Sequence, residues 1–202
     1  MEFKGKYIRL IPLKMGHAEA LTKAANIFRE IFPLSSVPVD VDSILRCIQM
    51  ANYLCTERSA IPFVIVEKFN KKIIGSTGFL NLEYWDFPTG HKLRRTDKIP
   101  TVVEIGSEYL VEPDQSPKII FDAKLCLLTH AFEEWEVLRV AFKTDARNKQ
   151  SRINIERIGA KFDGVIRAHR QDYGCEVTDT AFYSILKSDW PKLKTRLKSK
   201  LR

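Results

Sequence analysis

The sequence predicts an α/β fold in which helices flank a mixed sheet. Two segments with helical spacing of apolar residues come early in the chain, and short runs rich in β-branched and aromatic residues follow them. The second half then reads strand, helix, strand, helix, strand, strand. Two strands that flank a helix in this way run parallel through a right-handed crossover, so we expect one parallel pair within the sheet.

The N-terminal half is expected to hold one strand, two helices and a hairpin. Alternating apolar residues predict the strand, and apolar residues at helical spacing predict the first helix. Asp40 or Asp42 can cap the second helix, and residues 68–71 suit a hairpin turn. The predicted elements are a strand at 3–13, helices at 15–32 and 40–53, and strands at 62–67 and 72–80.

The C-terminal half begins with a long surface loop, predicted because residues 81–100 contain two prolines, a glycine and seven charged residues. A helix over 119–133 places its aromatic and leucine side chains on one face. A shorter helix has Asn148 at its start and Gly159 just past its end, which are favoured residues at those positions. The strands around these helices are predicted at 101–111, at 137–143, from residue 161 onward and at 180–186.

Bulk composition favours a single domain over residues 1–202. The chain has 202 residues and is 45% apolar, which is enough for one sizeable core. No apolar run approaches the roughly 20 residues that a bilayer span requires, and no signal peptide is evident, so we expect a soluble cytoplasmic protein without membrane contact. Its four cysteines form no C-x-x-C pair and its four histidines have no ligand spacing, so we expect no metal.

Several motifs along the chain resemble the GNAT acyltransferases, and specifically the branch that contains the ribosomal-protein N-terminal acetyltransferases. The motifs are Tyr7-Ile-Arg-Leu-Ile-Pro-Leu13, Ile74-Gly-Ser-Thr77, Glu104-Ile-Gly106, Arg147-Asn-Lys-Gln-Ser151 with Glu156-Arg-Ile-Gly-Ala160, and Tyr183 to Pro191. The resemblance implies a mostly antiparallel sheet with a splayed parallel central strand pair. It also implies transfer of an acetyl group from acetyl-CoA to a primary amine, by direct attack in a ternary complex. The acceptor would be a protein N-terminus or a small amine.

Attack on a thioester requires a neutral amine, so a carboxylate must remove a proton from the ammonium form. Glu104 and Glu108 are the two candidates, and they face the same side of their strand unless a bulge intervenes. Glu104 is the better base because the family pattern at this place is E-I-G. The alternative for both is a solvated strand carboxylate without a catalytic role.

Other residues are implied in holding the cofactor. In similar enzymes the thioester arm binds the edge of this strand, where the backbone groups would be those of Tyr109, Leu110 and Val111. Asn148 would contact the cofactor arm, although Asn is also a common helix cap. Ser151 would protonate the departing thiolate, with Tyr109 as the second choice.

The phosphate loop departs from the family pattern, in which glycines let backbone N–H groups approach the pyrophosphate. Gln115 matches the pattern, yet Ser116, Lys118 and Ile120 occupy glycine positions. Pro117, between them, lacks an N–H group. Phosphate binding would therefore use Gln115, Ser116, Lys118, Ile119 and Ile120, with the Lys118 ammonium as compensation. The alternative is a catalytically weak or inactive member that serves as a binding or interaction module.

The net charge of +8 is concentrated in a basic C-terminal helix predicted at 189–202. Residues 192–202 carry six Lys or Arg and no acid, so the rest of the chain has a charge of 8 − 6 = +2. Leu193, Leu197 and Leu201 recur every four residues and form one apolar stripe on a helix. Either the helix packs this stripe on the domain, or the tail contacts a ribosomal protein, RNA or an acidic partner.

Overall fold

The computed structural model describes residues 1–31, 38, 40–95, 98–110, 117–171 and 176–201. The strands in this part of the chain are β1 (Phe3–Lys4), β2 (Ile8–Pro12), β3 (Ile61–Glu67), β4 (Ile73–Glu83), β5 (Val102–Leu110), β6 (Arg139–Asp145), β7 (Lys161–Gln171) and β8 (Val177–Leu186). The helices are η1 (Met15–His17), α1 (Ala18–Ile31), α2 (Val41–Thr56), α3 (Pro117–Thr129), η2 (His130–Glu134), α4 (Lys149–Ile158), η3 (Lys187–Asp189) and α5 (Trp190–Lys200).

Over the described residues, the eight strands form one sheet in the order β1-β2-β3-β4-β5-β6-β8-β7. Neighbouring strands are antiparallel except β5 and β6, which are parallel and are connected through α3. The predicted mixed, mostly antiparallel sheet is thereby confirmed. None of the helices in the described ranges is long and apolar enough to cross a membrane.

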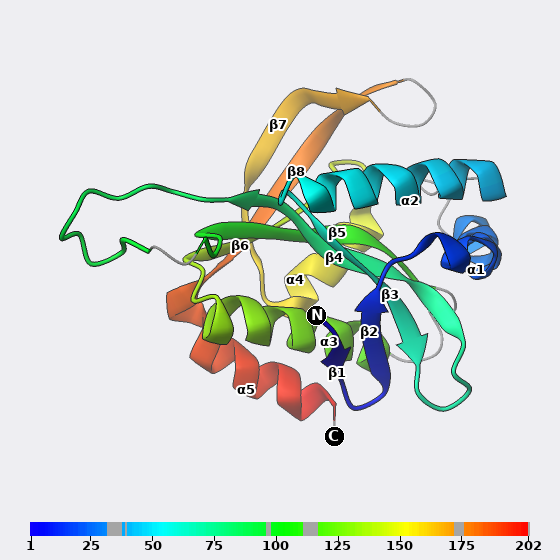
Figure 1. The fold of residues 1–202 in the computed structure, drawn as a ribbon, viewed down its shortest axis with the longest axis horizontal. Coiled ribbons are helices and arrows are strands. Elements are labelled where there is room, and N and C mark those ends of the chain that lie inside the picture. The colour runs from blue at the N-terminus through cyan, green and yellow to red at the C-terminus, as the bar shows by residue number, and fades with distance from the viewer. Residues whose placement is uncertain (32–37, 39, 96–97, 111–116, 172–175, 202) are drawn as a thin grey trace.

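Helices cover both faces of the sheet (Figure 1). In the view of Figure 1, α3 and α5 lie below the sheet and α2 lies above it, while β7 and β8 extend as a long hairpin at the top. The main core lies between the sheet and helices α3 and α5 and includes Phe63, Phe79, Val103, Val140 and Phe142. A smaller core joins α1 and α2 to the opposite face.

The expected strand at 3–13 was wrong, because β1 and β2 are separate strands joined by a tight turn. The Asp122 carboxylate of α3, 2% exposed, accepts hydrogen bonds from the backbone N–H groups of Lys6, Tyr7 and Ile8, at 2.9, 2.7 and 3.2 Å. A side chain on Gly5 would clash with that carboxylate. A residue on a distant helix thus fixes the turn.

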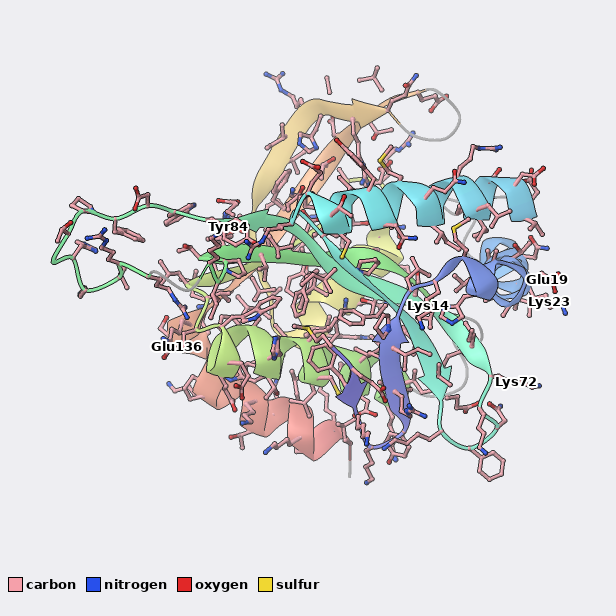
Figure 2. All side chains as sticks on the ribbon, viewed as in Figure 1. Lys14, Glu19, Lys23, Lys72, Tyr84 and Glu136 are labelled. Carbon is pink, nitrogen blue, oxygen red and sulfur yellow. The ribbon has the colours of Figure 1, made fainter. Side chains whose placement is uncertain are left out.

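Two further boundaries differ from the sequence expectation. Strand β4 continues to Glu83, so the surface loop begins at Tyr84 rather than at Asn81. Figure 2 shows Tyr84 where the loop that extends to the left leaves the sheet, and Lys72 on the opposite side of the molecule in the β3–β4 turn. Helix α3 begins at Pro117, whose missing N–H group costs little in a first turn, and continues beyond Thr129 as one π-helical turn.

Helix α5 packs its leucine stripe on the main core. Leu193, Leu197 and Leu201 are all buried, which agrees with the structural interpretation of this stripe. The C-terminal end of the helix is held by the N-terminal hairpin, because the Leu201 carbonyl accepts from Lys6 Nζ at 2.7 Å and Tyr7 Oη at 3.1 Å. Both ends of the described chain are therefore attached to the same region of the fold.

Replacement of Asp122 by Ala should lower the free energy of unfolding by about 3 kcal/mol, because it leaves three backbone N–H groups of the turn without an acceptor. Chemical denaturation followed by circular dichroism measures this loss. Asp122→Asn keeps one acceptor oxygen and should lose less. Equal stability of the Ala variant and the parent would contradict the role of this carboxylate.

His130 makes stability depend on pH. Its ring packs against Phe3 and Trp135, with centroids 5.1 and 4.6 Å away, and its Nε2 atom is buried without a hydrogen-bond partner among the described residues. Desolvation by this burial lowers the pKa of His130 below its ordinary value of 6.5. Because the unfolded chain then binds the proton more tightly, stability is full above pH 6.5 and falls as the pH drops through the lowered pKa.

Thermal unfolding of His130→Phe at about pH 7.5 and about pH 5.5 tests this dependence. The melting temperature of the parent should be lower at the lower pH. The decrease should be smaller in the variant, because phenylalanine cannot be protonated. The remaining fall would include His17, whose pKa is also lowered by burial. A fall of the same size in both proteins would show that the His130 ring is not responsible.

Candidate active site

The parallel pairing of β5 with β6 extends over only three residue pairs. Val102, Val103 and Glu104 of β5 pair with Arg139, Val140 and Ala141 of β6. Both strands continue beyond this point, β5 to Leu110 and β6 to Asp145, but the ladder between them does not. In these described strands the sheet therefore opens into a seam that begins beside Glu104.

A bulge in β5 accompanies the opening. Ser76 pairs with Tyr109 and Gly78 with Gly106, so β5 has one residue more than β4 between these pairs. A bulge is the exception that the sequence expectation allowed for, so regular alternation no longer places Glu104 and Glu108 on the same side. The backbones of Tyr109 and Leu110 pair with β4 on one edge only, which leaves the edge toward β6 to the seam.

Glu104 lies on the face of the sheet opposite the main core. Val103 and Ile105 point into that core, so Glu104 and Gly106 point to the other face, on which α1 and α2 lie. The Glu104 side chain is almost buried, and its Oε2 atom accepts a hydrogen bond from Asn81 Nδ2 at 2.7 Å and forms an ion pair with Lys143 Nζ, also at 2.7 Å. Two donors thus stabilise a carboxylate in a place with little water.

The second oxygen of this carboxylate lies near Gly106, two residues further along β5. A methyl group added to Gly106 would lie 3.3 Å from Glu104 Oε1 and 2.9 Å from Leu80 Cδ1. No donor to Oε1 is present among the residues that the structure describes. The carboxylate is therefore fixed through Oε2 and can accept a proton at Oε1.

Asn81 reaches Glu104 because of a second irregularity, this time in β4. Leu80 pairs with Glu104 and Glu83 with Val102, so here β4 carries the extra residue. Asn81 lies in this bulge with a φ of 45°, a left-handed conformation that Asn adopts more readily than most residues. The sequence expectation placed Asn81 in a loop and missed this contact. The signal in the sequence is a polar residue at the end of an apolar strand.

The other predicted residues lie at the helix starts on either side of the seam. At the start of α4, Asn148 Oδ1 accepts from the Ser151 backbone N–H at 3.0 Å, which is a helix cap. The Ser151 side chain is half-buried, and its hydroxyl has no hydrogen-bond partner in the described part of the chain. Asp145 and Arg147 hold the corner before this helix, and the hydrogen bonds from Arg147 lower the pKa of the Asp145 carboxyl.

At the start of α3, the Ile119 and Ile120 side chains are half-buried and pack against the main core. Lys118 Nζ lies 6.0 Å from the centre of the Tyr7 ring. The first turn of this helix has backbone N–H groups without carbonyl partners in the helix itself, as every α-helix does. Val111, Gln115 and Ser116 lie outside the described residues, as do the side chains of Glu108, Tyr109 and Leu110.

A separate shallow pocket lies at the other end of β5. Arg58, Tyr84, Lys98 and Trp135 are among the residues that line it. None of the predicted site residues contributes to its walls. The described residues with a predicted catalytic role therefore lie at the seam and not in this pocket.

Solved structures with the same arrangement include proteins that are named acetyltransferases. A GCN5-related N-acetyltransferase from Brucella melitensis superposes with a TM-score of 0.81 at 23% identity, covering 100% of this chain and 86% of that one. A candidate acetyltransferase from T. thermophilus superposes with a TM-score of 0.75 at 27% identity, covering 100% of this chain and 97% of that one. RimJ of Mycobacterium smegmatis, solved with CoA-disulfide, superposes with a TM-score of 0.77 at 15% identity, covering 98% of this chain and 94% of RimJ. The fold is that of this class of enzymes.

The sequence places the chain more narrowly. Residues 8–161 match the model of the acetyltransferase (GNAT) domain, and the chain belongs to this family. It is also similar to YdaF of Bacillus subtilis strain 168, a candidate ribosomal N-acetyltransferase, with 35% identity over 98 residues. That match spans 48% of this chain and 52% of YdaF, so it covers about half of each protein.

Asn148→Ala should lower the free energy of unfolding by about 1 kcal/mol, since the variant loses the cap of α4. Asn148→Ser keeps a side-chain acceptor and should retain most of the stability. Thermal and chemical unfolding of both variants measure the difference. If Ala and Ser variants were equally stable, the cap would contribute nothing and Asn148 would be left with the cofactor role alone.

Proposed function

We propose that the protein transfers an acetyl group from acetyl-CoA to a primary amine, which is a protein N-terminus or a small amine. The observation that carries the proposal is the end of the β5–β6 ladder beside Glu104. Family membership supports acetyl-CoA as the donor. The name of YdaF favours a ribosomal protein as the acceptor, although that match extends over only half of the chain.

The seam suits an extended thioester arm. The edge of β5 beyond Glu104 offers backbone donors and acceptors, including those of Tyr109 and Leu110, that no described strand occupies on the β6 side. An extended ligand can pair with such an edge as an added strand would. Ile119 and Ile120 pack at least part of their side chains against the core, and so direct that part away from the helix start. The backbone N–H groups of the first turn of α3 therefore support phosphate binding.

Glu104 is the proposed general base. An acceptor ammonium must lose a proton before its nitrogen can attack the thioester carbonyl. Glu104 Oε1 is available for that proton while Oε2 stays fixed by Asn81 and Lys143. Ser151, whose hydroxyl has no partner among the described residues, is the proposed acid for the CoA thiolate. The transfer forms one N–C bond, breaks one C–S bond and releases CoA.

Glu104→Gln should lower kcat by about 100-fold while acetyl-CoA binding is retained, because a general base contributes roughly 10²–10⁴ to the rate. The loss should be largest at low pH and smaller at high pH, where the acceptor amine is already neutral. Steady-state kinetics from about pH 6 to about pH 10 and calorimetry with acetyl-CoA provide the two measurements.

Glu108→Gln is the matched variant, because Glu108 is the other carboxylate of the same strand. If it lost turnover and Glu104→Gln did not, the base would be Glu108. If neither variant nor the parent bound acetyl-CoA, the protein would instead be an inactive relative that serves as a binding module. The altered phosphate loop, with Lys118 and Ile120 in glycine positions, motivates this alternative.

A further inference from the structure

Lys143 contacts the proposed base, and the proposed reaction uses it only to hold that carboxylate in place. It lies on β6 two residues beyond Ala141, where the pairing with β5 ends. Val140 and Phe142 point into the main core, so Lys143 points to the same face as Glu104. Its ammonium lies 5.1 Å from the centre of the Phe182 ring, and its side chain is 23% exposed.

The contact between Lys143 and Glu104 places a possible acceptor amine beside the proposed base. Lys143 is a primary amine, and its Nζ atom lies 2.7 Å from Oε2 of the proposed base. Proton transfer requires heavy atoms within about 2.6–3.2 Å, and this distance meets that requirement. An amine held in place within the same molecule reacts as though it were present at very high concentration.

We propose that Lys143 is itself acetylated by acetyl-CoA bound in the seam, so that the protein carries an internal acceptor. This inference rests on the proposed function. Glu104 takes one proton from the Lys143 ammonium, and the nitrogen lone pair attacks the thioester carbonyl carbon. An N–C bond forms and the C–S bond breaks. CoA leaves as a thiolate that takes up the second proton lost by the Lys143 nitrogen, and Glu104 releases the first proton to water.

Acetylation changes the electrostatics of the site. The ammonium of Lys143 occupies Glu104 Oε2, and an incoming acceptor ammonium must approach a carboxylate that is already neutralised. The acetylated side chain has no charge, so Glu104 regains a full net negative charge and attracts a second amine more strongly. Acetylation of Lys143 would also remove one of the two contacts at Oε2 and leave the Asn81 contact in place.

Mass spectrometry of the full-length protein incubated with isotope-labelled acetyl-CoA tests the proposal. The peptide that contains Lys143 should gain one labelled acetyl group, at a first-order rate that does not depend on protein concentration. Lys192 of α5, which is exposed, serves as the internal comparison for spontaneous acetylation. Glu104→Gln should slow labelling of Lys143 by about 100-fold and leave Lys192 unchanged.

Lys143→Arg is the matched variant, because it keeps the positive charge beside Glu104 and removes the acceptor amine. The intact mass of this variant should not show the rapid gain of one labelled acetyl group. Thermal unfolding of the variant checks that the fold is kept. Labelling of Lys143 no faster than that of Lys192, in protein that binds acetyl-CoA by calorimetry, would overturn self-acetylation alone. A protein that binds no acetyl-CoA would overturn this inference and the proposed function together.

Discussion

The short parallel ladder between β5 and β6 is the constraint on which the site depends. Pairing through Glu104 and Ala141 holds the two strands together at one end, and the bulge after Gly106 turns β5 away from a regular path. Because β4 still pairs with β5, and β8 with β6, the sheet stays continuous on both sides of the opening. A gap between two central strands is thus kept without loss of the sheet that surrounds it.

The polar cluster of Asn81, Glu104 and Lys143 shows how the protein accommodates an almost buried carboxylate. An isolated charge in such a place is costly, and a pair of donors on one oxygen offsets much of that cost. The arrangement leaves the second oxygen without a donor among the described residues. The same cluster therefore both stabilises the carboxylate and leaves it reactive.

Local patterns predicted most of the fold, and distant contacts account for what they missed. The parallel pair and the α4 boundaries, with Asn148 as N-cap and Gly159 in a left-handed C-cap, follow from short-range signals. The β1–β2 turn depends on Asp122, more than a hundred residues away. Lys143 reaches Glu104 only in the register that the parallel pair adopts, and the bulge that separates Glu104 from Glu108 has no local sequence signal. The leucines of the basic tail are used in packing, and its contact with RNA stays a prediction.

The hydrogen bonds of Asp122 to Lys6, Tyr7 and Ile8 join residues 116, 115 and 114 positions apart. During translation, at about 5–20 residues per second, roughly 6–23 s separate synthesis of the hairpin from synthesis of its helical anchor. For that time β1 and β2 are an undocked nascent segment with Ile8 and Leu10 exposed to solvent. The feature that locks the finished fold thus gives the growing chain an apolar segment for chaperones to shield.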